Sequence, residues 1–444
     1  MKKNFQFIFL AALLIVTSCK PDREENKSDH QKLWYNQPAN ASVADDPNGW
    51  KDDPEWLKAL PVGNGSFGAM VFGDVNKERI QLNEESMWSG SPADNDNPDA
   101  FAHQDEIRQL LFDGKYKEAT ALTNSTQICK GHGSGHGNGA EVPFGCFQTL
   151  GDLWIDNGSS EAYQNYHREL DLEDAVARVS YTQNGVDYKR EIFSSNQDQI
   201  MAIRFTANET GKISFKTTMT RPERFKTYSE NDQLIMQGAL SDGKDGDGLQ
   251  YICRLKALSK NGTVRYKGSE LIIENADEVT LILSASTDYK LEYPDFKGRD
   301  YEKITANNIK KASKLSFETL LKNHKKEYQE YYKRVSLDLT QNQKDTIPTD
   351  LRVANYKKTK SDLKLEELIF QYGRYLLVSS SRPGTLPANL QGIWANKIQT
   401  PWNGDYHTDV NVEMNYWLAE TTNLSEMHGP LFDLIKSLEI YYWA

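Results

Sequence analysis

The sequence predicts a multi-domain protein: an N-terminal all-β sandwich, a helical linker and the start of an all-α domain. Three observations support this prediction. Short apolar runs that alternate with polar residues dominate from about Leu33 to Tyr301, and the apolar spacing then changes to that of helices. The chain has 444 residues, which is too long for one ordinary core. Strands and helices that are segregated along a chain are typical of separate domains.

Composition and charge argue against two classes of protein. Charged residues make up 26% and hydrophobic residues 38% of the chain, which is the balance of a folded rather than a disordered protein. The net charge is -11 and no basic stripe is present. We therefore expect no nucleic acid as a partner, because such binding needs cations against phosphates. The many aromatic residues favour a neutral polar ligand.

The first residues are predicted to direct export. Lys2 and Lys3 precede an apolar run, Phe5 to Val16, that is too short for a typical membrane span. The run ends in Val-Thr-Ser-Cys, which resembles the lipobox of bacterial lipoproteins, with Cys19 as the lipidated residue; a plain secretory signal is the alternative. We expect residues 1–19 to be a lipoprotein signal peptide and residues 20–31 a flexible tether. The protein would then be lipid-anchored in the bacterial cell envelope, and would contact the membrane only through this anchor.

Three further cysteines leave several interpretations open. Cys129 and Cys146 are the nearer pair and could form a disulfide in an exported protein. With His132 and His136 they also provide four potential zinc ligands, but the Gly-rich segment between them is poorly suited to preset a site. An ordinary surface loop with buried thiols is the third interpretation. We expect no metal and no cofactor.

Strand patterns predict the β-sandwich over residues 32–301. Ala177 to Phe193 consists of two alternating runs around Asn184-Gly185, a strong hairpin signal. Ile213 to Thr220 and Leu271 to Thr287 repeat the alternation, the latter with a turn at Asn275–Glu278. Many short strands at such spacing favour a sandwich. Apolar residues at helical spacing predict a helical interruption at Phe101 to Thr123.

Helical patterns dominate the remainder. Tyr301 to Arg334 is amphipathic, and a polar break follows at Gln341 to Asp350, so residues 302–350 are predicted to form a helical linker. Residues 351–444 are predicted to begin an all-α domain. Its first helix carries an apolar stripe and is ended by Arg382-Pro383-Gly384. The stripe consists of Leu365, Leu368, Ile369, Tyr372 and Leu376. Two more helices are expected at Val412–Glu420 and Leu431–Leu438.

The segment from Arg382 to Trp417 has the composition of a sugar site. Sugars are bound by flat aromatic faces and by planar side chains with paired donors and acceptors, and this Gly/Pro-punctuated segment is rich in both. Trp394 and Trp402 are candidates for stacking, although each could equally belong to the core. The candidates for binding hydroxyls are Asn403, Asp405, Tyr406 and His407, the last of which could instead satisfy backbone groups of the loop.

Several long motifs resemble one known family. LPVGNGSFGAMVFGDVNKERIQLNEESMWSG (Leu60 to Gly90), FQTLGDLWID, YHRELDL and ANLQGIWANK…PWNGDYHTDVNVEMNYWLAE…NLSEMHGPLFDLI resemble successive blocks of glycoside hydrolase family 95. The resemblance extends from about Leu33 to Leu438. It implies an N-terminal β-domain, a helical linker, a catalytic (α/α)6 barrel and a C-terminal β-domain. It also implies inverting, exo-acting release of α-L-fucose from fucosylated oligosaccharides, or of α-L-galactose in some members.

The resemblance also implies two catalytic positions. The water-activating pair of the family lies in an Asn-x-Asn motif just before MNYW, which corresponds to Asp409 and Asn411, so this chain has Asp where the family has Asn. Inversion needs a base that activates water and an acid on the opposite face, and a carboxylate beside a carbonyl oxygen suits the first role. The alternative role for Asp409 is a helix N-cap. His407 would share its face if the segment is extended. The Asn83-Glu84-Glu85 run favours a polar contact between domains over a second catalytic pair.

The family's general acid and a further Asp lie later in its barrel. Twelve helices of about 11 residues need well over 200 residues, and the segment from Lys364 to Ala444 holds three or four. We therefore expect a C-terminally truncated member with an incomplete barrel that is inactive as written. The alternatives to an α-L-fucosidase are an α-L-galactosidase of the same family and a non-catalytic glycan-binding lipoprotein.

Overall fold

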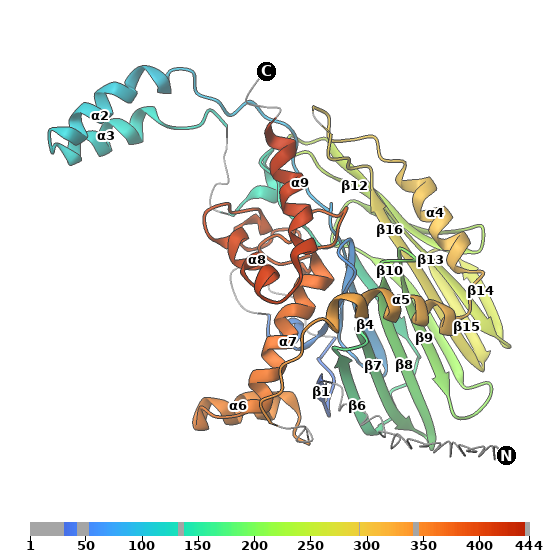
Figure 1. Ribbon diagram of the computed structural model, residues 1–444. Helices are drawn as coiled ribbons and strands as arrows, with labels where there is room; N and C mark the ends of the chain where they lie inside the picture. The colour runs from blue at the N-terminus through green and yellow to red at the C-terminus, as the bar shows by residue number, and fades with distance from the viewer. Residues whose placement is uncertain (1–30, 42–52, 132–136, 293, 341–345, 440–444) are drawn as a thin grey trace, which may run out of the picture.

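The computed structural model describes residues 31–41, 53–131, 137–292, 294–340 and 346–439 (Figure 1). The predicted signal peptide with Cys19, nearly all of the predicted tether, and His132 and His136 lie outside these ranges. Within them, none of the helices combines the length and the apolar character that a membrane span requires.

Two antiparallel sheets form the N-terminal part, as the sequence predicts. The nine-stranded sheet has the spatial order β1 (Lys32–Tyr35), β6 (Gln164–Asp171), β7 (Val176–Gln183), β8 (Val186–Ser195), β9 (Ile200–Ala207), β16 (Glu278–Thr287), β13 (Asp247–Lys260), β12 (Gln233–Ser241) and β11 (Phe225–Glu230). The seven-stranded sheet has the order β14 (Thr263–Lys267), β15 (Glu270–Ala276), β10 (Ile213–Thr220), β5 (Gly151–Asp156), β4 (Lys77–Glu84), β3 (Phe67–Val71) and β2 (Leu60–Gly63).

The β7–β8 hairpin confirms the turn prediction. Gln183 pairs with Val186 across a two-residue turn, and Asn184 and Gly185 have φ angles of 53° and 79°. Two positive φ values are what a type I′ turn requires, and Asn and Gly tolerate them.

The turn near Asn275 is also present, but it does not make a hairpin. β15 pairs with β14 and β10 in one sheet, whereas β16 pairs with β13 and β9 in the other. Consecutive strands therefore cross from one sheet to the other. Alternation defines which face of a strand is buried, but it does not identify the partner strand.

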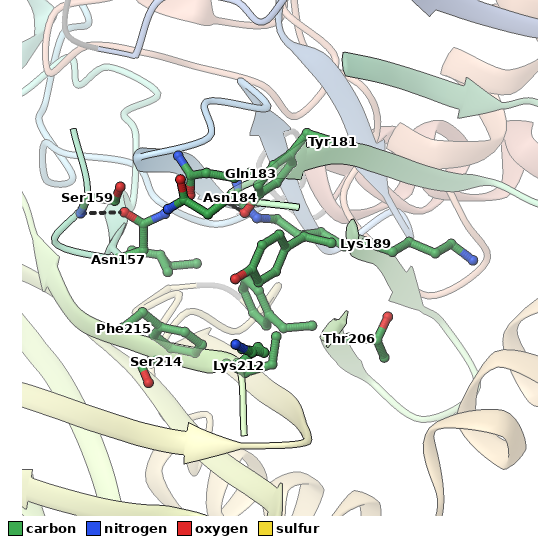
Figure 2. Close-up of a pocket in the computed structure, with 15 residues that line it drawn as sticks. Asn157, Ser159, Tyr181, Gln183, Asn184, Lys189, Thr206, Lys212, Ser214 and Phe215 are labelled. Carbon is green, nitrogen blue, oxygen red and sulfur yellow. Dashed lines mark hydrogen bonds between the residues drawn. The ribbon is translucent and has the colours of Figure 1, made fainter. Parts of the chain in front are cut away.

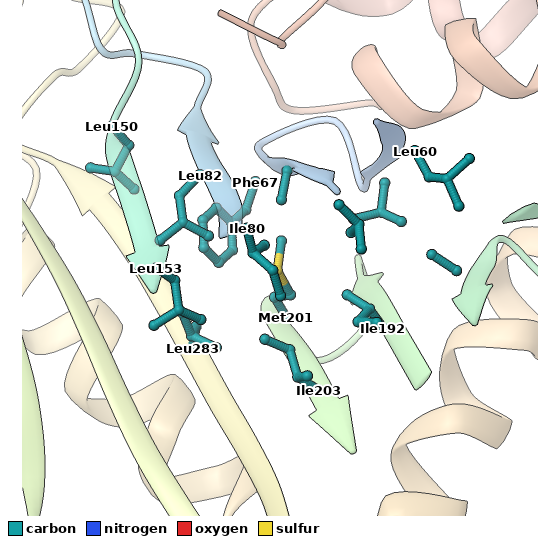
Figure 3. Packing of buried hydrophobic residues seen from close by; sticks show 14 of the residues in the cluster. Leu60, Phe67, Ile80, Leu82, Leu150, Leu153, Ile192, Met201, Ile203 and Leu283 are labelled. Atoms are coloured by element: carbon teal, nitrogen blue, oxygen red, sulfur yellow. The ribbon is translucent and has the colours of Figure 1, made fainter. Parts of the chain in front are cut away.

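The main core fills the space between the two sheets (Figure 3). Leu82 and Leu153 come from the seven-stranded sheet, and Met201, Ile203 and Leu283 from the nine-stranded sheet. Ile200 and Ala202, the alternate residues of β9, belong to a second apolar cluster that includes residues of the helices outside the sheet. Successive side chains of a strand point to opposite faces, so β9 is covered on both.

Two helices, α4 (Tyr301–Ala312) and α5 (Phe317–Tyr332), cover the outer face of the nine-stranded sheet (Figure 1). The predicted amphipathic stretch is therefore two helices rather than one. Ser316 separates them, and its side chain caps α5 by accepting a hydrogen bond from the Thr319 amide. Ile309 and Phe317 pack with Phe193 of β8. Both helices of the predicted linker thus pack against the β-domain.

The predicted interruption at Phe101–Thr123 is a helical arm. A 3-10 turn, η1 (Ala100–His103), leads into α2 (Gln104–Phe112) and α3 (Tyr116–Thr126), which project away from the sandwich (Figure 1). Gly114, with φ of 73°, lies at the turn between them. The chain also forms α1 (Pro54–Lys58) and η2 (Gly139–Glu141), which the sequence analysis did not identify.

The C-terminal part is helical, as expected. It contains α6 (Thr349–Thr359), α7 (Leu363–Ser380), η3 (Pro401–Gly404), α8 (Asn411–Thr421), η4 (Ser425–His428) and α9 (Gly429–Leu438). The stripe predicted on α7 is wrong in part, because Ile369 is 61% exposed. The buried face instead includes Gln371 and Arg374, which donate hydrogen bonds to the carbonyls of Val335 and Tyr332. A search for apolar residues does not find these polar positions.

Candidate functional site

The candidate site lies on the long loop between α7 and α8. Buried Arg382 fixes the start of this loop: its guanidinium donates to the Val378 carbonyl at 2.7 Å and forms an ion pair with Glu327 of α5, also at 2.7 Å. The Thr385 hydroxyl accepts a hydrogen bond from the Arg382 amide at 3.1 Å. The Arg-Pro-Gly-Thr sequence is therefore a turn whose direction is set by contacts with the helices.

The β-domain holds the middle of the loop. Asn83 of β4 donates to the Ala395 carbonyl at 2.8 Å, and Lys397 forms an ion pair with Asp53 at 2.8 Å. The Phe147 amide donates to the Asn403 carbonyl at 2.8 Å. These partners are buried or largely buried. Because the loop satisfies its backbone groups on the sandwich, its shape is imposed by the β-domain.

Two of the predicted sugar-binding residues are buried against the β-domain. Trp394 is only 6% exposed, and its indole N–H donates to the Val62 carbonyl at 3.0 Å. Asn403 is 1% exposed, and its Oδ1 accepts from the Gly139 amide at 3.0 Å. Both side chains are buried and hydrogen-bonded to the backbone of the β-domain, so the structure places them in the scaffold rather than at a sugar-facing surface. Trp394 thus belongs to the core, which is the alternative that the sequence left open for it.

Asp405 and His407 form a close pair. His407 Nε2 lies 2.7 Å from Asp405 Oδ1, and the two side chains are 35% and 13% exposed, respectively. Burial raises the pKa of Asp405, and the neighbouring imidazole opposes that increase. His407 would share a face with Asp409 only on an extended segment, and this condition is not met because residues 408–410 form a turn. The imidazole is therefore oriented by Asp405.

Tyr406 connects the loop to the motif that ends in Trp88. Its hydroxyl donates to the Pro387 carbonyl at 3.0 Å, and its ring stacks on Trp88 with centroids 5.3 Å apart. Burial raises the pKa of this phenol well above its usual value. Tyr406, Trp88 and Tyr289 line a largely apolar cavity of about 580 Å³ between the sandwich and α9. Tyr406 is thus a candidate for contact with a ligand in this cavity.

Asp409 and Asn411 are exposed on either side of Val410, at the start of α8. The N-cap position of α8 is Val410, with φ of 66°, and no side chain caps the helix. The predicted alternative role of Asp409 as an N-cap is therefore wrong. Trp402, at 57% exposure, also presents an aromatic surface on this loop. Exposure leaves Asp409, Asn411 and Trp402 accessible to a ligand.

The Glu84-Glu85 pair makes a contact between domains, as predicted. Glu85 is 5% exposed, and its carboxyl accepts a hydrogen bond from the Leu386 amide in the loop. Burial, with a further contribution from Glu84, raises the pKa of Glu85 to about 8. Glu84 accepts hydrogen bonds from the amide and the hydroxyl of Ser86, both at 2.7 Å, and burial raises its pKa.

The cysteines of the β-domain do not form the suggested disulfide. Cys129 is exposed and Cys146 is buried, and both are free thiols. Cys146 Sγ lies 3.1 Å from the Thr400 hydroxyl, and burial raises its pKa to about 11. The zinc alternative stays untested because His132 and His136 lie outside the described residues. Within those residues, no group of three or more His, Cys, Asp or Glu side chains is arranged to hold a metal ion.

Comparisons with known proteins match both parts of the chain. Residues 33–292 match "Glycosyl hydrolase family 65, N-terminal domain", and residues 316–441 match "Glycosyl hydrolase family 95 catalytic domain". The protein "Alpha-L-fucosidase 2" of Arabidopsis thaliana is 36% identical over an alignment of 416 residues that covers 87% of this chain and 48% of that protein. The chain belongs to glycoside hydrolase family 95.

A second family 95 relative is "Probable alpha-fucosidase A" of Aspergillus niger. It is 30% identical over 421 residues, which cover 86% of this chain and 49% of that protein. This chain therefore spans about half the length of the curated relatives that it matches. The matched region contains the β-domain, α4, α5 and the loop with Asp409 and Asn411.

Sequence reasoning missed two residues of α8 that position the loop. Asn415 of α8 donates to the Asn389 carbonyl at 3.0 Å, and the Tyr416 hydroxyl accepts from the Ala388 amide at 2.9 Å. Both residues lie in the Met-Asn-Tyr-Trp motif, whose sequence alone does not reveal these backbone contacts. Trp88 lies in the motif Leu60 to Gly90, and its stacking on Tyr406 is a contact between segments that are distant in sequence.

Proposed function

We propose that this chain provides the water-activating side of an inverting glycosidase site that releases terminal α-L-fucose from fucosylated oligosaccharides. Membership of family 95 supports this proposal, as do the names of the curated relatives, which are α-fucosidases in Arabidopsis thaliana and Aspergillus niger. The observation that carries it is the exposed pair Asp409 and Asn411 at the start of α8. These positions correspond to the water-activating motif of the family.

The proposed chemistry assigns one role to each residue. The Asp409 carboxylate takes a proton from water as the water oxygen attacks the anomeric carbon of the fucoside. The amide of Asn411 holds the same water by a hydrogen bond. The new C–O bond forms on the face opposite the breaking glycosidic bond, so the sugar leaves as β-L-fucose. The resemblance places the acid that protonates the leaving oxygen later in the catalytic domain than Leu438.

An activated aryl fucoside tests the water-activating side by itself. The leaving group of 2,4-dinitrophenyl α-L-fucopyranoside departs as a stable anion and needs little protonation. The expectation of an inactive chain applies to fucosides whose leaving oxygen must be protonated. We expect the 444-residue chain to release this activated leaving group, with β-L-fucose as the first product in a proton NMR time course. Asp409→Ala should lower kcat/KM by about 100-fold or more, the usual scale for loss of a general base. Asp409→Asn, which restores the family residue, should retain more activity than Asp409→Ala.

The matched control is Glu413→Ala, which removes an exposed carboxylate four residues after the proposed base, in the first turn of α8. It should leave kcat/KM unchanged. Release of α-L-fucose as the first product, or equal rates for wild type and Asp409→Ala, would refute the proposal. The corresponding α-L-galactoside, assayed in parallel, distinguishes the two sugars, because it differs only in the hydroxymethyl group at C5.

A further inference from the structure

A second hollow lies within the β-domain, at one end of the sandwich. It has a volume of about 210 Å³ and is lined by residues of both sheets. Figure 2 shows Phe215 and Lys212, near the start of β10, on one side, and Tyr181, Gln183 and Asn184 of the β7–β8 hairpin on the other. The two sheets therefore form opposite walls of a small open pocket.

This hollow is remote from the candidate catalytic loop. Tyr188 and Lys189, near the start of β8, line the hollow. Ser195, at the other end of β8, accepts a hydrogen bond from Asn64 at 3.0 Å, and the neighbouring Gly65 amide donates to the Ser379 carbonyl of α7. A strand rises about 3.3 Å per residue, so Ser195 lies about 23 Å from Tyr188. A ligand in the hollow therefore does not share the site at Asp409.

Aromatic rings make up much of the lining. Tyr181 and Tyr188 are stacked, with centroids 5.2 Å apart and planes at 19°, and Phe205 contacts Phe215 at 4.8 Å between centroids. Phe205, Phe215 and Tyr181 are buried, whereas Tyr188 is only partly buried. Tyr188 is thus the ring with surface left for a ligand. Aromatic side chains provide a large contact area for the apolar face of a sugar ring.

Neutral hydrogen-bonding groups surround these rings. Within the described part of the chain, the Tyr188 hydroxyl, the Thr206 hydroxyl and the Asn184 side-chain amide make no hydrogen bond to protein. All three residues line the hollow. Hydroxyls both donate and accept, and an amide offers both functions in one plane, which suits the hydroxyl groups of a sugar.

The cationic side chains that line the hollow each form an ion pair with a carboxylate of the protein. Lys212 pairs with Glu209 at 3.1 Å, Lys189 with Glu191 at 2.9 Å, and buried Arg190 with Glu78 at 2.8 Å. An anionic ligand would have to compete with a carboxylate at each of them. The charge balance therefore favours an uncharged ligand.

We propose that this hollow binds one residue of a neutral glycan, as a second carbohydrate site separate from the loop at Asp409. The inference does not depend on the proposed function, because its residues lie in the β-domain. Its effect would be to hold a glycan at a second point on the protein.

Saturation-transfer NMR on the full chain tests this site with two neutral probes, methyl α-L-fucopyranoside and methyl β-D-galactopyranoside. N-acetylneuraminic acid is the anionic comparison. At least one neutral probe should show saturation transfer at millimolar concentration. Tyr188→Ala should weaken its binding by about tenfold, the scale for truncating an aromatic contact residue. Thr206→Val, which removes one hydroxyl at constant shape, should weaken it by a smaller factor.

The matched control is Tyr116→Ala, because Tyr116 is an exposed aromatic residue on the distant α3 arm. Its binding should equal that of wild type, and all variants should keep the wild-type circular dichroism. His407→Ala separates the two sites, since binding at the loop would fall in that variant and not in Tyr188→Ala. Three results would each overturn the proposal: no transfer to either neutral probe, binding unchanged in Tyr188→Ala, or transfer to the acid alone.

Discussion

The buried carboxyl of Glu85 is predicted to make the protein less stable as pH rises, and Glu85→Gln should remove that contribution. Glu85 lies between β4 and the loop after α7, with its side chain 5% exposed and hydrogen-bonded to the Leu386 amide. Burial raises its pKa from 4.5 to about 8. The folded state therefore holds a proton that the unfolded state releases between these two values. Its contribution to stability is complete below pH 4.5 and is lost as pH rises through about 8.

The size of the effect follows from the pKa difference. A raise from 4.5 to about 8 is roughly 3.5 units, and each unit corresponds to about 1.4 kcal/mol. The maximum change in the free energy of unfolding is thus on the order of 5 kcal/mol, and relaxation around the charge would reduce it. Glutamine keeps an oxygen that can accept from the Leu386 amide, and it stays neutral at every pH.

Urea denaturation followed by tryptophan fluorescence, at about pH 5.5 and about pH 8.5, measures this difference. We expect Glu85→Gln to exceed wild type by about 1.4 kcal/mol at the lower pH, which lies one unit above the unfolded-state pKa, and by a few kcal/mol more at the higher pH. Glu270→Gln, an exposed substitution at the start of β15, is the control and should follow wild type at both. If Glu85→Gln shows the same pH dependence as wild type, Glu85 is not a buried neutral acid.

Three further predictions follow from the contacts of the loop and from the N-terminal sequence. Trp394→Phe should lower the free energy of unfolding by about 1–2 kcal/mol through the lost bond to Val62, while kcat/KM on the activated fucoside stays at the wild-type value; a selective loss of kcat/KM would return Trp394 to the sugar site. Arg382→Met leaves the partly buried Glu327 without its cation and should cost about 3–5 kcal/mol in urea denaturation; a cost near zero would mean that the pair does not fix the loop. Cys19→Ser should move the protein from the membrane fraction to the soluble fraction and abolish palmitate labelling, and unchanged fractionation would refute the lipid anchor.

The individual strands could be predicted where the local alternation of apolar and polar residues defines them. Alternation identified β7, β8 and β10, and the Asn184-Gly185 turn fixed one register because only a few residue types adopt its two positive φ angles. Strand pairing was not predictable in the same way. β15 and β16 are adjacent in sequence yet belong to different sheets, because their partners are distant segments that local alternation does not specify.

The candidate site was predictable as a segment but not residue by residue. Its composition predicts a sugar site because aromatic and amide side chains bind sugars. The same side chains can instead form hydrogen bonds with backbone groups of the protein. Trp394 and Asn403 use their donors and acceptors on the β-domain backbone, whereas Trp402 and Asn411 are exposed. Composition does not separate these two uses. Separation requires the partner strands, which only the folded chain brings together.

The β-domain therefore helps to shape the candidate loop between α7 and α8. Contacts from β4 and from the segment around Phe147 hold the loop at Ala395 and Asn403, and Trp88 holds Tyr406 by stacking. Asp409 follows Tyr406 by three residues. The Asn415 side chain donates a hydrogen bond to the Asn389 carbonyl, and this bond fixes α8 against the loop. The position of the proposed base Asp409 thus depends on the contacts from the β-domain and on the contact from α8. A helical region without the sandwich would lack the first set of contacts and would not hold Asp409 in this position.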